Sequence, residues 1–303
     1  MSNADGDAPV GLAVVDKPAG WTSHDVVARA RRLLGTRKVG HAGTLDPDAT
    51  GVLLLGVGRA TRLLRYLTGL PKTYETDIVL GEETDTLDAS GTTTATHDMS
   101  GVTLDEVRRA AATLTGDLEQ IPPMVSAVRV GGRRLHELAR EGIEVERAAR
   151  PVHVERFDVD ALTDPGEPPL RLRAVVTCSS GTYVRVLAAD LGSALGGGAH
   201  LDNLRRTAVG PFALDEAVAL DDLGTGSLLD PGEALRWLPS VSVDADTATV
   251  VGHGRVLPLD EVAPPGEQPP ERWRVLGPDG RLLAVYRVHT GGRARPEVVL
   301  VGG

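Results

Sequence analysis

The spacing of apolar residues in the first quarter of the chain predicts two helices. Between the capping pair Thr22 and Asp25 and the terminating Gly35, apolar side chains recur every three to four residues, which is the period of a helix with one buried face. The same period returns over residues 60–67. Both predicted helices carry arginines on a second face, and these are Arg29, Arg31, Arg32, Arg59, Arg62 and Arg65.

Other segments have an extended pattern. Residues 10–15 predict a short strand, and the apolar run 52–57 predicts a strand buried on both faces. Residues 74–80 and 171–178 alternate apolar and polar side chains, which is typical of strands with one buried face. Residues 209–212 are expected to form another strand.

The middle of the chain returns to the helical period twice. Thr103 and Glu106 form a capping box for a helix that ends near Gly116, and a second apolar stripe covers 184–195. Successive prolines predict an extended segment over 121–127. The mixture of helices and strands indicates an α+β protein.

Beyond Pro239 the pattern changes to short strands separated by turns, interrupted by a proline-rich stretch at 263–270. The predicted strands there are 250–251, 255–257, 273–276, 282–288 and 297–301. We therefore expect a flexible N-terminus over 1–9, a large domain over 10–238 and a small β-rich domain over 239–303.

The composition excludes several classes of protein. A single cysteine, Cys178, excludes an internal disulfide and a cysteine-based metal cluster, and its place in an alternating strand predicts a buried, inert thiol. The first residues lack the basic start and apolar core of a signal peptide, and no apolar run approaches the length needed to cross a membrane. We expect a cytoplasmic protein that does not associate with membranes.

The charges are distributed unevenly along the chain. The net charge is −10, but residues 16–72 hold ten Lys/Arg against four Asp/Glu, whereas residues 75–119 hold two against eleven. A basic segment within an acidic protein indicates a surface that faces a polyanion, because binding responds to the local field. The alternative is a pair of ordinary solvated helix faces.

The loop over residues 38–51, between the two basic helices, is the candidate site. It contains three glycines, Pro47 and the carboxylates Asp46 and Asp48. Glycine lets the backbone approach a ligand closely, and a proline disfavours the helical conformation at the residue before it. A carboxylate held in such a loop can act as a nucleophile, a base or a metal ligand. The alternative is that Asp46 only begins a turn.

Five sequence features follow one another between residues 11 and 212. They are Asp16-Lys17-Pro18-x-Gly-x-Thr22-Ser23, Gly40-His41-x-Gly43-x-Leu45-Asp46-Pro47-x-Ala49-Thr50-Gly51, Tyr74, Gly81-x-x-Thr84-Asp85-Thr86-x-Asp88 and Gly181-Thr182-Tyr183-x-Arg185. Together and in this order they resemble the motifs of the TruB family of tRNA pseudouridine synthases.

The resemblance implies a pseudouridine synthase fold, with a central mixed β-sheet flanked by helices and a PUA-like RNA-binding domain at the C-terminus. It implies isomerisation of uridine 55 in the T loop of tRNA. Asp46 matches the catalytic aspartate, Tyr74 matches the tyrosine that stacks on the target base and shuttles a proton, and Arg185 matches the arginine that pairs with that aspartate. The positions matched to substrate binding are His41, Tyr183, Leu204 and Lys17, the last in a motif with a structural role. The implied partner is the T arm of tRNA, bound by a monomer with no metal and no small-molecule cofactor.

The chain departs from the family pattern at Val125, Arg129 and His136, which leaves the RNA contacts of that segment open. Three rival functions also stay open at this point: a module that binds or folds the T arm without chemistry, a synthase relative guided by a small RNA, and a nucleoside hydrolase that releases uracil. The sequence does not separate attack of Asp46 on the ring, attack on the sugar, and proton removal to give a glycal.

Overall fold

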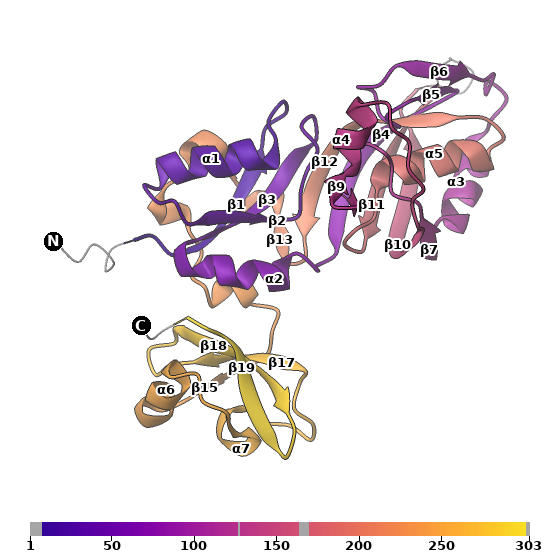
Figure 1. The fold of residues 1–303 in the computed structure, drawn as a ribbon. Helices are drawn as coiled ribbons and strands as arrows, with labels where there is room; N and C mark the ends of the chain where they lie inside the picture. Colours follow the sequence, from indigo (N-terminus) through magenta and orange to yellow (C-terminus); the bar gives the residue numbers. More distant parts are fainter. Residues whose placement is uncertain (1–7, 127, 164–169, 301–303) are drawn as a thin grey trace. The chain divides into compact units, whose positions relative to one another are not determined.

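The structure, a computed structural model, describes residues 8–126, 128–163 and 170–300. Most of the predicted flexible N-terminus, Ala127 and Val301 lie outside the described residues, as does the side chain of His136. The chain divides into two compact units of mixed helix and strand (Figure 1). The first unit comprises Met1–Pro47, Val52–Thr68 and Pro211–Gly303, and the second comprises Asp48–Gly51 and Gly69–Gly210.

The first unit begins with a small mixed sheet covered by a helix. Its strands are β1 (Gly11–Lys17), β2 (Val39–Ala42), β3 (Thr50–Val57) and β14 (Val218–Ala219), with β2 antiparallel to β3 and β14 parallel to β1. Helix α1 (Ser23–Leu33) packs Val26, Val27 and Ala30 against apolar residues of β1 and β3. The predicted capping box forms, because Thr22 and Asp25 exchange hydrogen bonds at the start of α1.

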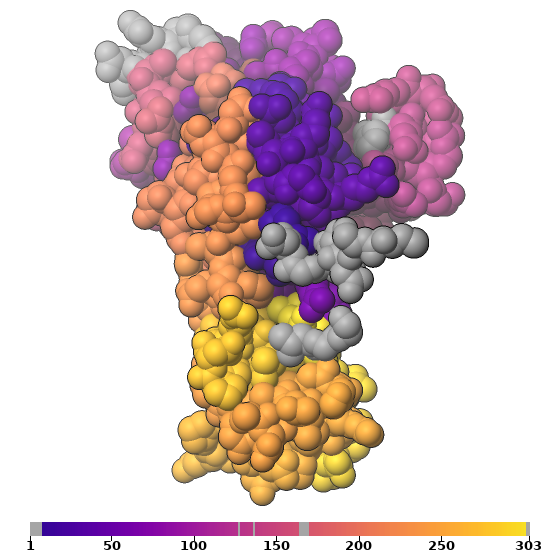
Figure 2. All heavy atoms as spheres, turned by 90° about the vertical axis from the view of Figure 1, so that its left-hand side faces the viewer, coloured from indigo at the N-terminus to yellow at the C-terminus, as the bar shows by residue number. Residues whose placement is uncertain are grey.

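Short helical turns complete this part of the unit. The helix predicted over 60–67 is present, but its first part is the 3₁₀ helix η1 (Gly58–Leu63) and only α2 (Leu64–Leu67) is α-helical. The remaining short elements are β13 (Phe212–Ala213), η2 (Leu214–Glu216), η3 (Leu220–Asp222), η4 (Thr225–Ser227) and η5 (Glu233–Leu235). Helix α1 lies beside the η3 segment, and Figure 2 shows the indigo N-terminal part next to the orange part of the chain. Arg29 of α1 donates to Asp221 of η3 at 2.8 Å.

The C-terminal part of the first unit forms its own five-stranded sheet around a core centred on Trp273 and Tyr286. In spatial order the strands are β15 (Ser240–Ser242), β17 (Arg272–Leu276), β18 (Leu282–His289), β19 (Arg293–Val299) and β16 (Leu257–Pro258). The helices are α6 (Ala245–Gly252) and α7 (Leu259–Val262). The prediction of a strand at 250–251 is wrong: both valines lie in α6, which Asp244 caps by accepting from Thr247 N.

The second unit is built on an antiparallel sheet. In spatial order its strands are β12 (Ala199–Val209), β4 (Lys72–Leu80), β11 (Arg171–Cys178), β10 (Arg150–Ala161) and β7 (Gly116–Gln120). The first two residues of β3, Thr50 and Gly51, also belong to this unit and pair in parallel with Arg205 and Arg206 of β12. The alternation over 74–80 and 171–178 therefore predicted two adjacent central strands.

Two helices and two hairpins complete the second unit. Helix α3 (Leu104–Thr113) packs on β10 and α5 (Val184–Ala194) packs on β12. The predicted capping box of α3 forms between Thr103 and Glu106. The hairpins are β5 (Glu82–Thr84) with β6 (Thr93–Thr96) and β8 (Arg129–Val130) with β9 (Arg133–Arg134), the latter followed by α4 (Leu135–Arg140).

Candidate active site

Asp46 lies in the turn that joins β2 to β3 in the hairpin. The strands pair from Val39 opposite Val57 to Ala42 opposite Leu54, so the residues between them form the closed end of the hairpin. Gly43 enters this turn with a φ of +84°, a left-handed conformation that glycine adopts without strain. The predicted loop over 38–51 is therefore shorter than expected, because its two ends are strand.

Ser23, the first residue of α1, fixes the backbone directly before Asp46. Its hydroxyl accepts from Leu45 N at 2.9 Å and lies 3.2 Å from Leu45 O, to which it donates. Both side chains are buried, Ser23 with 1% and Leu45 with 4% of its surface exposed. A hydrogen bond buried in this way is costly to remove, because the backbone groups would lose their partner out of reach of water.

Lys17 fixes the backbone directly after Asp46. Its side chain is fully buried, and its ammonium donates to the carbonyl oxygens of Pro18 at 2.9 Å, Trp21 at 2.6 Å and Pro47 at 2.8 Å. Pro47 O accepts a second bond, from Gly20 N at 3.0 Å. Because the residues on both sides of Asp46 are anchored, the backbone holds the Cα–Cβ bond that carries this half-buried carboxylate in place.

His41, on β2, is half-buried, and its ring lies edge-on to the ring of His24 with 5.3 Å between centroids. The first unit thus contains three of the predicted site residues: Asp46, His41 and Lys17. The contacts of Lys17 agree with the structural role expected of its motif.

In the second unit, Arg185 is held at the start of α5. Its guanidinium is buried, with 5% of the side chain exposed, and donates to Thr86 O at 3.1 Å, Val125 O at 3.0 Å and Asp88 Oδ2 at 3.2 Å. Tyr183 is the residue before α5, so both positions follow the end of β11, where the sequence placed them.

Asp88, the last residue of the fourth sequence motif, is a functional candidate to which the sequence analysis assigned no role. Its second oxygen, Oδ1, accepts from Thr86 Oγ1 at 2.7 Å, Ser90 N at 3.1 Å and Ser90 Oγ at 2.5 Å. The loop is also tied to β12, because Ala89 N donates to Leu201 O and Leu201 N donates to Leu87 O. An aspartate followed two residues later by serine is the sequence signal of such a turn. The long-range contact with Arg185 has no local signal.

Gln120 is a second such residue. Its side chain is 3% exposed, accepts from Tyr183 N at 2.9 Å and donates to Tyr183 O at 3.3 Å. The last residue of β7 therefore fixes the backbone of Tyr183, whose own side chain is half-buried.

Tyr74 and Leu204 lie on neighbouring strands of the same sheet. Tyr74 is 8% exposed on β4, opposite Val176 of β11 and Arg206 of β12. Leu204 is half-buried where the pairing of β12 with β4 shifts, directly after Asn203, which has a φ of +50°. The second unit thus contains Tyr74, Tyr183, Arg185 and Leu204.

Two ionisable groups lie two residues along the paired strands β4 and β11 from Tyr74. Lys72 is 5% exposed and donates to Leu70 O at 2.6 Å; burial, with the positive charge of Arg206, lowers the pKa of Lys72 to about 8. Cys178 lies opposite Lys72 in the β11–β4 pairing, and burial raises the pKa of its thiol to about 11. The prediction of a buried Cys178 is confirmed.

The basic helices serve in part as internal braces. Arg29 and Arg31 donate to Asp221 and to Val39 O, and Arg59 and Arg62 donate to the carbonyl oxygens of Leu300 and Val299. Near them, Tyr66 donates to Glu297 at 3.1 Å, and burial together with this carboxylate raises the pKa of Tyr66. These four arginines therefore also bind groups of the protein itself, and the expectation that the basic segment faces a polyanion stays a prediction.

Among the residues that the structure describes, no group of three or more His, Cys, Asp or Glu side chains is arranged to hold a metal ion. No helix in the same ranges is both long enough and apolar enough to cross a membrane.

The chain matches three protein-family models, which follow one another along the sequence. Residues 31–184 match the TruB family pseudouridylate synthase N-terminal domain, residues 185–236 match the tRNA pseudouridylate synthase B C-terminal domain, and residues 238–301 match the tRNA pseudouridine synthase II C-terminal model. The first model alone covers more than half of the chain.

Curated relatives agree with these matches. The chain is 48% identical over 294 residues to a protein named tRNA pseudouridine synthase B from Arthrobacter sp. (strain FB24), covering 95% of this chain and 96% of the relative. It is 55% identical over 251 residues to a protein of the same name from Rhodococcus jostii (strain RHA1), covering 82% of each.

Solved structures show the same fold. A chain in a structure titled Cbf5-Nop10-Gar1 complex superposes with a TM-score of 0.72 at 25% identity, covering 100% of this chain and 92% of that one. A chain in a structure titled H/ACA RNP bound to a substrate RNA containing 2'-deoxyuridine has a TM-score of 0.71 at 23% identity, covering 99% and 92%. The expected pseudouridine synthase fold is confirmed.

Proposed function

The chain belongs to the TruB family of pseudouridine synthases, and on that premise we propose that it isomerises uridine 55 in the T loop of tRNA to pseudouridine, with Asp46 as its indispensable residue. The observation that carries the proposal is the mounting of Asp46. Buried Ser23 and Lys17 bind the backbone on either side of it, so the Cα–Cβ bond that carries one half-buried carboxylate is held in place. Such preorganisation is what a reacting group requires and what a plain turn does not.

The reaction breaks an N-glycosidic bond, turns the uracil and rejoins it through carbon, so atoms are conserved and no electron donor or acceptor is needed. A uridine stacked in an RNA loop must first be turned out, at a cost of a few kcal/mol, in order of magnitude. Stacking of the base on Tyr74 would offset that cost by about 1–3 kcal/mol. The relatives named as synthases support the reaction, and Tyr74 on β4 supplies the aromatic ring that this role requires.

Arg185 pairs with Asp46 in this proposal and keeps the carboxylate ionised in a dry pocket. A guanidinium carries five N–H donors in a fixed plane. The bonds to Thr86, Asp88 and Val125 hold that plane in place, so a carboxylate brought to it would meet donors that need no reorganisation.

The remaining predicted roles extend the proposal. His41, Tyr183 and Leu204 line the place of the flipped nucleotide, while Lys17 contributes through the backbone of Pro47. Residues 10–238 act as the catalytic domain, and residues 239–303, with their separate sheet, act as a PUA-like RNA-binding domain. The protein works as a monomer on the T arm of tRNA in the cytoplasm, without a metal or other cofactor.

The test is an assay for pseudouridine in an unmodified T-arm stem-loop, incubated with purified protein and no added cofactor or magnesium. Wild-type protein is expected to convert the loop uridine, and Asp46→Asn is expected to give no product while binding the RNA nearly as well. Asp48→Asn is the matched control, because it removes an exposed carboxylate two positions away in the same turn.

Three results would contradict parts of the proposal. Normal turnover by Asp46→Asn would remove Asp46 from the mechanism. Tight binding with no product from folded wild type would favour a binding module without chemistry. Free uracil as the product would indicate a hydrolase. Each path from Asp46, through the ring, the sugar or a glycal, makes the same prediction for this variant.

A further inference from the structure

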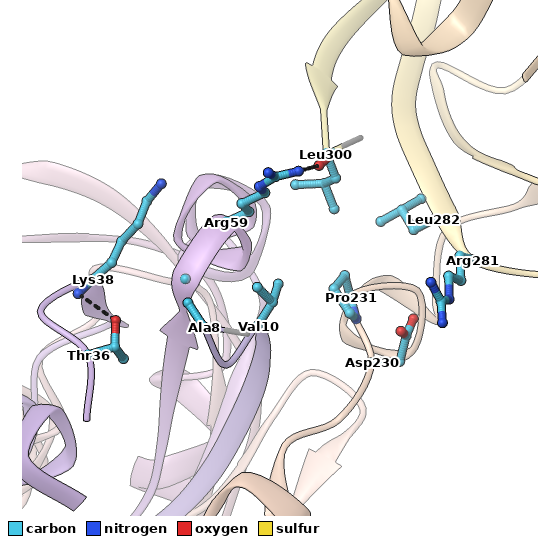
Figure 3. A pocket seen from close by; sticks show the side chains of 11 residues that line it. Ala8, Val10, Thr36, Lys38, Arg59, Asp230, Pro231, Arg281, Leu282 and Leu300 are labelled. Carbon is cyan, nitrogen blue, oxygen red and sulfur yellow. Dashed lines mark hydrogen bonds between the residues drawn. The ribbon is translucent and has the colours of Figure 1, made fainter. Parts of the chain in front are cut away.

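A pocket of about 780 Å³ lies in the first unit, and Figure 3 shows the side chains that line it. It is open to solvent and is formed by segments far apart in the sequence. Its lining includes Val10, Lys38, Arg59, Asp230, Arg281 and Leu282. None of the predicted site residues lines it.

The pocket and Asp46 lie toward opposite ends of the β2–β3 hairpin. Lys38 directly precedes β2 and Gly58 directly follows β3, whereas Asp46 is in the turn that closes the hairpin. Each strand residue advances the chain by about 3.3 Å, so the length of β2 alone separates Lys38 from the turn by more than about 10 Å. A uridine bound at Asp46 therefore does not reach this pocket, which is open to another part of the same ligand.

The walls of the pocket are fixed by the backbone. Gly58 N donates to Lys38 O at 2.7 Å, which ties the open ends of the hairpin together. A side chain at Gly58 would meet Pro9 O at 2.5 Å, so the absence of one lets the Val10 segment pack against it. The opposite wall is tied to β1, because Leu12 and Leu229 exchange backbone hydrogen bonds of 2.9 and 2.8 Å.

Three cations and one acidic residue line this pocket. Figure 3 shows Lys38, Arg59 and Arg281 on three different sides of the pocket, with the apolar side chains of Val10 and Leu282 between them. All three cations are exposed, and Arg59 is fixed by a bond of 3.2 Å to Leu300 O.

The acidic groups near the pocket leave its positive charge in excess. Asp230 accepts from Gly232 N at 2.7 Å. Asp279, outside the lining, pairs with Arg281 at 3.5 Å, but both side chains are more than half exposed, so water weakens that pair.

We propose that this pocket binds the sugar–phosphate backbone of the tRNA substrate at a nucleotide away from the target uridine. The identity of the RNA rests on the proposed function; the chemistry rests on the pocket. Cations on several sides of the pocket suit the phosphates on both sides of a nucleotide better than a single small anion, and the apolar Val10 and Leu282 can contact the carbon atoms of the ribose between them. In a protein of net charge −10, such a local positive site steers RNA to one face.

The test compares the double variant Lys38→Gln/Arg281→Gln with wild type and with the charge-matched control Arg109→Gln/Arg255→Gln, whose exposed side chains lie outside the pocket. The dissociation constant for unmodified tRNA is measured at several salt concentrations. Loss of two phosphate contacts is expected to weaken binding about tenfold and to reduce the salt slope by about one to two, with kcat unchanged. Arg59 is left in place because it also binds the main chain.

The outcomes separate the alternatives. If the double variant binds tRNA with the affinity and salt slope of the control, the assignment is overturned. If AMP or inorganic phosphate alone binds wild type and not the double variant while tRNA affinity is unchanged, the pocket serves a free nucleotide or ion, and the assignment to RNA is again overturned. If wild type makes no pseudouridine but the double variant still binds tRNA more weakly, the assignment of the pocket to tRNA is supported and the proposed function is contradicted.

Discussion

The two units hold their candidate residues by different means. In the first, a fully buried lysine, Lys17, binds three carbonyl oxygens and anchors the backbone beside Asp46. In the second, a buried arginine, Arg185, is itself the candidate residue and is held by two carbonyl oxygens and the Asp88 carboxylate. The first cation acts through the backbone, and the second presents its own donors. Changes at Lys17 should therefore act through folding, and changes around Arg185 through catalysis.

Lys17→Met should be the most damaging change to this arrangement. It keeps an unbranched side chain but removes the ammonium that binds the carbonyl oxygens of Pro18, Trp21 and Pro47, and of these Pro47 O keeps its bond from Gly20 N. We expect a loss of about 3–5 kcal/mol in the free energy of unfolding, measured by urea denaturation, and a fall in activity of similar scale. Lys38→Met, at an exposed lysine of the same unit, is the control and should leave the stability nearly unchanged.

Gly51→Ala tests the point at which the Asp46 turn enters the second unit. Gly51 has a φ of +100°, and an added Cβ would lie 2.1 Å from Arg206 O in the adjoining strand. Because the obstacle is backbone, we expect a destabilisation of about 3 kcal/mol in urea denaturation. Gly69→Ala, where nothing lies within 4 Å, should cost much less, and equal costs for the two would contradict the strain argument.

Lys72 is a third buried cation, and its lowered pKa predicts that the free energy of unfolding depends on pH. Its pKa is lowered by burial to about 8 in the folded protein, against an ordinary value of 10.5. Between pH 8 and 10.5 the unfolded chain binds more protons at Lys72 than the folded protein does, so the free energy of unfolding rises with pH. The cost of burying the charged ammonium is fully present below about pH 8. Relative to Lys72→Met, wild type should gain up to about 3 kcal/mol between pH 7.5 and 10.5 in urea denaturation. A constant difference in the free energy of unfolding between wild type and Lys72→Met over that range would show that burial does not destabilise the charged ammonium.

Asp88→Asn tests the contacts that hold Arg185 in the second unit. Of the four changes it should cost the least in the free energy of unfolding, about 2 kcal/mol. The amide keeps the shape of the side chain but removes the charge 3.2 Å from Arg185 Nη1. We expect kcat to fall about 10–100-fold with little change in tRNA affinity, because the arginine loses its orientation. Asp85→Asn is the control, since that carboxylate accepts from Thr92 N. Equal kcat values for the two variants would separate Asp88 from catalysis.

Local patterns in the sequence predicted local structure well. The capping boxes at Thr22 and Thr103 form, and the alternating run over 74–80 is β4. These succeed because a helix cap or a half-buried strand is decided within a few residues. The failure at 250–251 has the same origin: two adjacent β-branched residues suggest a strand, but the Asp244 cap and the packing of Val251 in the C-terminal core make a helix.

Contacts between distant residues were not predictable in the same way. Asp88 and Arg185 are 97 positions apart, and Gln120 and Tyr183 are 63 apart. Arg62 donates to a carbonyl 237 positions away, where the charge pattern indicated a surface for RNA. A single sequence reports charge and period, but the partner of a long side chain is set by the fold.

The most direct test of the account is to locate pseudouridine along an unmodified full-length tRNA after incubation with wild type, Asp46→Asn and Asp88→Asn. We expect modification at uridine 55 by wild type, none by Asp46→Asn, and slower modification at the same uridine by Asp88→Asn. Modification at another position by wild type, or an Asp46→Asn variant that still modifies uridine 55, would contradict it.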